Sequence, residues 1–447
     1  MIGYTTARTA LPPLVLLMAA ACGGGDTDSP PADTRAPEAE VPAASERTGS
    51  DPVTALASGS EELSPEELEA GRMDSSWKAY VEVDPAARSA GTASPEQRPA
   101  GAGSPESGSP DTAAAAAAEA GETSNPGWEE IRKETVNSQP RSLPIHGDVE
   151  GPAVARVQIL LDLNRFSPGV IDGRWGKNTE KAVYWFQKAN DLGATGEVDR
   201  ATLDALERGA GRELVVTRRI TEADISGPFE DLPEDVYARA EQPCLCYESQ
   251  REQLGEVFHA APELLEQLNP DVDLNTVSAG DPLDVPAVEP FHIDELPEGK
   301  YTGGDRVDRI VISDGGNYLH ALDDAGQILF HSPSTLGADY APSPEGDFSV
   351  ESITFDPTWH YQPELLSGVD PSKEDAVLPE GPNNAVGVVW MQLSKPHYGI
   401  HGTKAPETIG YATSHGCVRL TNWDAAFLGQ RIPPGVPVEF RDVTGRD

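Results

Sequence analysis

The residues best suited to chemistry lie near the C-terminal end of the sequence, where His401 precedes Cys417 by 16 positions. A thiol with an ordinary pKa of about 8.5 is mostly protonated at neutral pH, so a cysteine nucleophile needs a neighbouring base or cation. A separation of this length allows a strand end, a loop and a return to the same edge of a sheet. His401 follows the apolar strand-like residues 398–400 and is predicted to be the base.

The residues around Cys417 add groups that an acyl transfer would use. Gly416 lets the backbone turn tightly beside the nucleophile. Its amide, together with the amide of Cys417, is predicted to face the oxyanion of a tetrahedral intermediate. Arg419 lies on the same side of an extended chain as Cys417 and could bind a substrate carboxylate in bidentate fashion. The pattern therefore indicates acyl transfer through a cysteinyl thioester.

Two other interpretations of these residues stay open at this point. A single cysteine is more often a small buried apolar residue than a nucleophile. His401, His415 and Cys417 could also be three ligands of a zinc ion.

The segment that carries these residues has the period-two pattern of short β-strands. Apolar alternation occurs at residues 307–312, 318–322, 328–330, 386–393 and 398–401, with turn sequences such as 314–317 and 323–326 between them. Residues 424–431 alone look helical. Residues 305–441 are therefore predicted to form one mostly-β domain of ordinary size. The long stretch 357–379, with Trp359, His360 and Tyr361, is a candidate lid over the site because of its length.

The run His401-Gly402, followed by Ser414-His415-Gly416-Cys417-Val418-Arg419-Leu420 and then Asn422 and Asp424, resembles the signature of the L,D-transpeptidase catalytic domain, also called the YkuD domain. Supporting pieces are Pro344, Gly346, Phe348, residues 381–384 and Gly387, whereas Ala385 stands where relatives often have proline.

This resemblance implies that Cys417 is the acylated nucleophile and His401 its base, oriented by a main-chain carbonyl, here that of Gly402. It further implies that His415 and Ser414 line the site and that Arg419 contacts the acyl donor. It requires no cofactor and no metal.

Residues 150–210 have the apolar spacing of three short helices joined by turns that contain glycine. The pattern from Val157-Gln158 through residues 172–176 to Phe186-Gln187 and Asp199 resembles the peptidoglycan-binding type 1 domain. By that resemblance the segment holds peptidoglycan. Trp185 and Phe186 would also be explained as core residues, whereas the turn at Asp172-Gly173 is not demanded by packing.

Residues 215–290 are predicted to be an α+β spacer. Residues 268–270 and 280–286 are similar to parts of a LysM repeat, which binds carbohydrate, and a helical spacer is the alternative. Cys244 and Cys246 stand one residue apart and are predicted to be loop cysteines, either unpaired or paired with each other. The spacing of these residues does not match a metal site.

The chain of 447 residues is strongly acidic, with 33 Lys plus Arg against 74 Asp plus Glu and a net charge of −41. Nucleic-acid binding is therefore excluded, because cationic side chains must replace the counterions of the phosphates.

The N-terminal end carries an export signal. Residues 11–21 form an apolar run too short to span a bilayer, so residues 1–22 are predicted to be a signal peptide. The small residues before Cys22 resemble the lipobox of bacterial lipoproteins, which would make Cys22 a lipidation site. The alternative is an ordinary secretory signal with Cys22 incidental.

Residues 23–145 are rich in Pro, Ala, Gly, Ser and Glu, and are predicted to form a disordered tether. Within it, residues 61–83 contain enough large apolar side chains for a short helix or docking segment.

Together these features predict a multidomain exported protein of the cell envelope or periplasm, with a tether, a three-helix peptidoglycan-binding module, a LysM-like spacer and a mostly-β catalytic domain. The expected activity is L,D-transpeptidation, with peptidoglycan stem peptides and glycan as partners. A carboxypeptidase or an enzyme that anchors proteins to peptidoglycan would use the same site. A non-catalytic peptidoglycan-binding lipoprotein is the alternative from a different class.

Overall fold

The computed structural model describes residues 71–72, 78, 130–211, 213–297, 307–338, 341–366 and 369–442. Contacts divide the chain into Met1–Gly49 and Ser50–Asp447, and all described residues belong to the second unit. The predicted signal peptide and Cys22 lie outside the described residues. Within the described ranges, no helix is long and apolar enough to cross a membrane.

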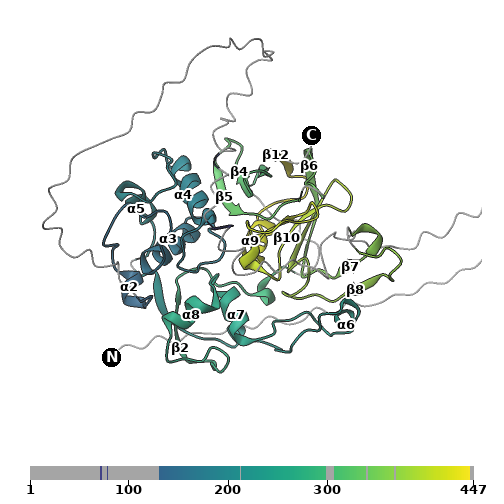
Figure 1. Ribbon diagram of the computed structural model, residues 1–447, viewed down its shortest axis with the longest axis horizontal. Coiled ribbons are helices and arrows are strands. Elements are labelled where there is room, and N and C mark those ends of the chain that lie inside the picture. The colour runs from purple at the N-terminus through teal and green to yellow at the C-terminus, as the bar shows by residue number, and fades with distance from the viewer. Residues whose placement is uncertain are drawn as a thin grey trace, which may run out of the picture. The chain divides into compact units, whose positions relative to one another are not determined.

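The N-terminal module contains α3 (Pro152–Leu163), α4 (Lys177–Ala189) and α5 (Arg200–Leu206), coloured blue in Figure 1. Pro152 begins α3, where its missing N–H costs nothing and its fixed φ suits the first turn. The Asp199 side chain caps α5 by accepting a hydrogen bond from the backbone N–H of Thr202. Val157, Leu160 and Phe186 are buried in the core between the helices.

The predicted end of the tether is wrong, because residues 130–145 are part of the module. This stretch contains α2 (Lys133–Asn137), and Ile131, Val136 and Ile145 are buried in the module's core. Three apolar side chains are enough to bind this short segment to an existing core. They were not recognised from the sequence because the average composition of residues 23–145 is that of a disordered tether.

The next segment pairs β1 (Val215–Arg219) with β2 (Pro282–Pro286) in an antiparallel ribbon. Between them lie η3 (Ala223–Ile225), α6 (Val236–Ala240), α7 (Gln250–Val257) and α8 (Pro262–Leu268). Apolar side chains of its strands and of α7 and α8 belong to the same core as those of the module, whereas Val236 and Leu245 belong to a separate cluster. The first strand of this segment is β1, which ends well before Cys244 and Cys246. The two cysteines lie in the loop between α6 and α7. The assignment as a LysM-like unit remains a prediction.

The C-terminal domain is built on an eight-stranded sheet of order β11-β10-β9-β6-β12-β3-β4-β5. Its strands are β3 (Arg309–Ser313), β4 (Tyr318–Leu322), β5 (Ile328–Pro333), β6 (Gly346–Phe355), β9 (Val389–Leu393), β10 (Gly399–His401), β11 (Val418–Arg419) and β12 (Pro437–Arg441). Helix α9 (Asn422–Gly429) covers the apolar core of this sheet with Trp423, Ala426 and Leu428. The mostly-β prediction is confirmed.

Residues 357–379 are more ordered than a loop. They form β7 (Trp359–Tyr361), the short helix η5 (Pro363–Leu365) and β8 (Ala376–Leu378), and the two strands pair in antiparallel fashion. Helix α6 of the spacer packs on β8, as Figure 1 shows, and the Tyr237 hydroxyl donates to the Glu374 carbonyl at 2.9 Å. We call β7, η5 and β8 the cap.

Buried polar contacts join the module to the sheet. The ammonium group of Lys181, which is fully buried in α4, donates to the carbonyls of Gly316 (3.1 Å) and Asn317 (2.8 Å) in the turn before β4. The Asp424 carboxylate of α9 accepts hydrogen bonds from Ser167 of the module (2.7 Å) and Ser332 of β5 (2.6 Å). The module is thus fixed on the catalytic domain rather than merely linked to it.

Replacing Lys181 should weaken this joint. Lys181→Ala leaves two carbonyls without their ammonium donor, so we expect the free energy of unfolding to fall by about 1–3 kcal/mol. Urea unfolding followed by tryptophan fluorescence measures the change. Lys188→Ala, which removes an exposed lysine from the same helix, is the matched control and should change stability by less than about 0.5 kcal/mol. Equal effects of the two variants would contradict this account of the joint.

Candidate active site

The parallel strands β10 and β11 place His401 and Cys417 at the same edge of the sheet, where the Cys417 thiol donates to the His397 carbonyl at 3.7 Å. Ile400 lies opposite Val418, and His401 lies opposite Arg419. Side chains alternate along a strand, so Cys417 and Arg419 lie on the same face as His401. Ile400 and Val418 belong to the core on the other face, whereas Cys417 belongs to the separate apolar cluster beneath the cap.

The imidazole of His401 is held in one tautomer. Its Nδ1 lies 2.7 Å from the Gly402 carbonyl, which can only accept, so Nδ1 carries the proton. Nε2 is then left with a lone pair, and within the described part of the chain this buried atom has no hydrogen-bond partner. Burial, aided by the charge of Arg419, lowers the pKa of His401 to about 3, against the opposing effect of the Gly402 carbonyl. The ring is neutral at physiological pH and able to accept a proton at Nε2.

Trp390 packs against His401 from the neighbouring strand. Trp390 lies opposite His401 across β9 and β10, and the two ring centroids are 5.5 Å apart. A Cβ at Gly399 would come within 2.2 Å of the indole ring, so glycine is needed there for the indole to lie across the strand. Trp390 and Gly399 thus hold the imidazole from one side.

The turn before Cys417 is closed by Ser414. The Ser414 hydroxyl donates to the Cys417 carbonyl at 2.6 Å and accepts from the Gly416 amide at 3.1 Å. The Gly416 amide is thus engaged by Ser414 here, and its role as an oxyanion donor remains a prediction. Gly416 is required for shape, since its φ is +105° and a Cβ would lie 2.7 Å from the Tyr398 ring.

The remaining predicted residues also lie at this edge. Arg419 is 7% exposed, and its backbone exchanges hydrogen bonds with Thr335. His415 is 8% exposed and precedes the turn at Gly416. His401, His415 and Cys417 do not form a metal site, because no group of three or more His, Cys, Asp or Glu side chains in the described ranges could hold an ion.

The side chains of Cys417 and His401 are both enclosed. Cys417 and His401 are 0% exposed, and the cluster around Cys417 includes Trp359 and Tyr361 of the cap. The cap therefore lies over Cys417 and shields its thiol from solvent.

A turn of the spacer also covers the cluster around Cys417. Cys244 and Cys246 form a disulfide, and Leu245 between them is buried in the same cluster as Cys417. The Leu245 amide donates to the Glu380 carbonyl (2.8 Å), and the Leu245 carbonyl accepts from the Asn383 amide (2.9 Å). The disulfide-bonded turn is thus attached to the loop that leaves the cap.

Two residues that position the site were not predicted from the sequence. The Asn422 amide oxygen accepts from the backbone N–H groups of Thr403 (3.1 Å) and Val388 (3.3 Å), and its nitrogen donates to Glu256 of α7 (3.0 Å). A Cβ at Gly402 would come within 2.2 Å of the Asn422 oxygen. Asn422 therefore fixes the backbone that follows His401. Asn422 stands in the motif, so its role could have been suspected, whereas nothing in the sequence singles out Glu256.

The C-terminal domain is mostly β and has a cysteine and a neutral histidine on one face of its sheet. A helical module precedes it in the chain. Family comparison agrees with that class. Residues 308–440 match the model of the YkuD family, "L,D-transpeptidase catalytic domain", and residues 150–206 match the "Putative peptidoglycan binding domain". The chain thus contains an L,D-transpeptidase catalytic domain preceded by a peptidoglycan-binding type of module.

Similar proteins have consistent names. The chain is 29% identical over 189 residues to "Putative L,D-transpeptidase YkuD" of Bacillus licheniformis, covering 42% of this chain and 92% of that protein. It is 40% identical over 89 residues to "Probable L,D-transpeptidase YbiS" of Escherichia coli, covering 20% of this chain and 28% of that protein. A solved L,D-transpeptidase structure from Xylanimonas cellulosilytica aligns with 18% identity and a TM-score of 0.28, covering 68% of this chain and all of that one.

Glu256 should make the stability of the protein depend on pH. Complete burial raises the pKa of Glu256 from 4.5 to about 8, so the folded state retains a proton that the unfolded state loses between these values. The free energy of unfolding therefore falls as pH rises through this window. Glu256→Gln cannot lose the proton, and we expect it to be more stable than the wild type at pH 8 by roughly 1–3 kcal/mol, with the difference shrinking toward pH 5.

Urea unfolding of both proteins across this pH range measures the difference. Glu222→Gln removes an exposed carboxylate from the same spacer and serves as the control. A constant difference between Glu256→Gln and the wild type at all pH values would show that Glu256 does not titrate as described.

Proposed function

We propose that this chain is a peptidoglycan L,D-transpeptidase that forms cross-links between stem peptides through a thioester at Cys417. The observation that carries the proposal is the arrangement at the β10–β11 edge, where Cys417 shares a face with a neutral His401 whose Nε2 can accept a proton. The catalytic-domain match over residues 308–440 supports the same activity.

The reaction is a two-step acyl transfer. His401 Nε2 takes the thiol proton, and the Cys417 thiolate attacks the amide carbonyl after the third stem residue, typically a diamino acid. The C–N bond breaks, and the terminal D-alanine leaves with the proton from His401. The amine of a second stem then attacks the thioester, its proton passes to His401 and on to the departing thiolate, and a 3→3 cross-link results.

The charges at the edge favour the nucleophile. Arg419 lies beside His401 across the parallel strands, and its positive charge disfavours an imidazolium while it stabilises a thiolate or a donor carboxylate. Because the Gly416 amide is engaged by Ser414, the Cys417 amide is the proposed oxyanion donor of the two. His415 lines the substrate path, and Ser414 acts by holding the turn.

The other domains place this chemistry on its substrate. The module over residues 150–210 is proposed to hold peptidoglycan, which raises the effective concentration of stem peptides without new chemistry. We further propose an exported protein in the cell envelope, with residues 1–22 as its signal peptide, Cys22 as a lipid anchor and most of residues 23–129 as a tether. Residues 215–290 act as a LysM-like spacer, and residues 305–441 are the catalytic domain.

Removal of the nucleophile should abolish turnover. With disaccharide-tetrapeptide as substrate, we expect the wild type to give dimers, and Cys417→Ala and His401→Ala to lose them by at least about 10³-fold, because the two side chains act as a unit. Mass spectrometry of the products measures this. His146→Ala, which removes an exposed histidine of the module, is the matched control. Tripeptide without dimers would identify a carboxypeptidase, and turnover by Cys417→Ala would refute the assignment.

A carbapenem should acylate the same thiol. The strained lactam carbonyl presents Cys417 with an acyl group in place of the stem peptide, so we expect one covalent adduct per chain and none on Cys417→Ala. Intact-protein mass spectrometry, followed by peptide mapping, locates the adduct. A protein that turns over muropeptide but never forms the adduct would contradict the proposed acyl-enzyme.

A further inference from the structure

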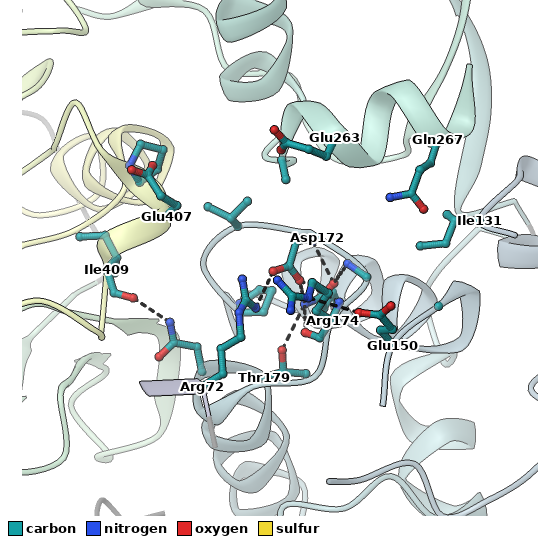
Figure 2. Close-up of a pocket in the computed structure, with 18 of the residues that line it drawn as sticks. Arg72, Ile131, Glu150, Asp172, Arg174, Thr179, Glu263, Gln267, Glu407 and Ile409 are labelled. Atoms are coloured by element: carbon teal, nitrogen blue, oxygen red, sulfur yellow. Dashed lines mark hydrogen bonds and ion pairs between the residues drawn. The ribbon is translucent and has the colours of Figure 1, made fainter. Parts of the chain in front are cut away.

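A cavity of about 490 Å³ lies where the module, the spacer and the catalytic domain meet, within the size range of sites for small ligands (Figure 2). Asp172 and Arg174 of the module's glycine turn form one wall, and Glu263 of α8 faces them. Glu407 of η6 (Pro406–Thr408) and Tyr411 close the side toward the catalytic domain. The turn at Asp172-Gly173 therefore opens on a cavity.

The lining of this cavity is predominantly acidic. Its charged members are five carboxylates and two guanidinium groups, namely Glu130, Glu150, Asp172, Glu263, Glu407, Arg72 and Arg174. Arg174 is paired with Glu150 at 3.3 Å. Such a lining favours a ligand with a positive charge.

One of those guanidinium groups comes from the N-terminal part of the chain, 100 positions before its partner. Arg72 donates to the Asp172 carboxylate at 2.7 Å, and its side chain is 16% exposed. The same guanidinium lies 5.9 Å from the centre of the Tyr411 ring. Lys78 forms a second ion pair with Glu180 of α4. The stretch predicted from sequence as a docking segment thus places a cation on the turn that borders the cavity.

We propose that this cavity is a binding site for a positively charged group of a peptide, and that Arg72 is its resident occupant in the free protein. Given the proposed activity on peptidoglycan, on which this inference rests, the competing ligand is a stem peptide with the free side-chain amine of a diamino acid. The ammonium group of that residue replaces the guanidinium of Arg72 at Asp172. The N-terminal segment accordingly competes with the polymer for the module.

The site adjoins the segment that leads into the catalytic motif. The Asn178 amide of α4 donates to the Ile409 carbonyl at 2.8 Å, and Lys177 lies 5.2 Å from the Tyr411 ring centre. Tyr411 is three residues before Ser414, whose hydroxyl holds the Cys417 turn. Exchange of Arg72 for a ligand therefore alters a contact on the chain that enters the active site.

Binding can be measured without turnover in the full chain carrying Cys417→Ala. The probes are disaccharide-tetrapeptide with a free diamino-acid amine and the same compound acetylated on that amine, titrated by calorimetry. Because an ion pair of this exposure contributes up to about 1 kcal/mol, Arg72→Ala should tighten binding of the free-amine probe by about fivefold. Asp172→Asn and Glu263→Gln should weaken it, and acetylation of the probe should weaken it in every variant that retains Asp172.

Arg200→Ala is the matched control, because it removes an arginine from an exposed ion pair elsewhere on the module. Unchanged or weaker binding by Arg72→Ala would overturn the occupant assignment, and indifference to acetylation or to both carboxylate variants would overturn the site. Asp172→Asn retains the oxygen that accepts from the Gln158 side chain and from the Arg174 backbone N–H, so the turn should fold. Transpeptidation by the wild type is assayed separately, so loss of the proposed activity and loss of this site are distinguishable.

Discussion

The geometry of the reacting edge depends on one buried amide, that of Asn422. Its oxygen holds the backbone after His401 and the entry to β9, and its nitrogen reaches Glu256 in the spacer. The approach is so close that Gly387 and Gly402 have no room for a side chain beside it. The Gly402 carbonyl is thereby held where it selects the tautomer of His401. A catalytic constellation is only as accurate as the shell that locks it, and here that shell extends into a different segment of the chain.

Burial keeps His401 neutral and also shields the Cys417 thiol from solvent. The burial that lowers the pKa of His401 extends to Cys417, which lies in the apolar cluster beneath the cap. The cap rests on α6 and on the disulfide-bonded turn at Cys244 and Cys246. The spacer and the cap therefore both contribute to the burial of the Cys417 thiol.

The module, spacer and catalytic domain behave as one packed unit. Module and spacer share a single apolar core, while Lys181 and Asp424 join the module to the sheet through buried hydrogen bonds. His259 of the spacer pairs with Asp162 of α3 and stacks on Trp423 of α9, with ring planes inclined by 8°. Buried contacts thus join the three parts, in contrast to domains that are connected only by flexible linkers.

The sequence by itself determined the local features of this protein. Strand alternation and the helices of the module follow from periodicity and residue type, which act over a few positions. The motif around His401, Cys417 and Arg419 predicted an acyl-transfer site there. Tertiary structure alone decided that residues 130–145 belong to the module, that the Gly416 amide binds Ser414, and that residues 357–379 are a hairpin. It also brought Glu256 to Asn422 and Arg72 to Asp172, pairs separated by 166 and 100 positions. Contacts at such separations depend on how whole elements pack, and the sequence around one partner does not indicate which distant residue it will contact.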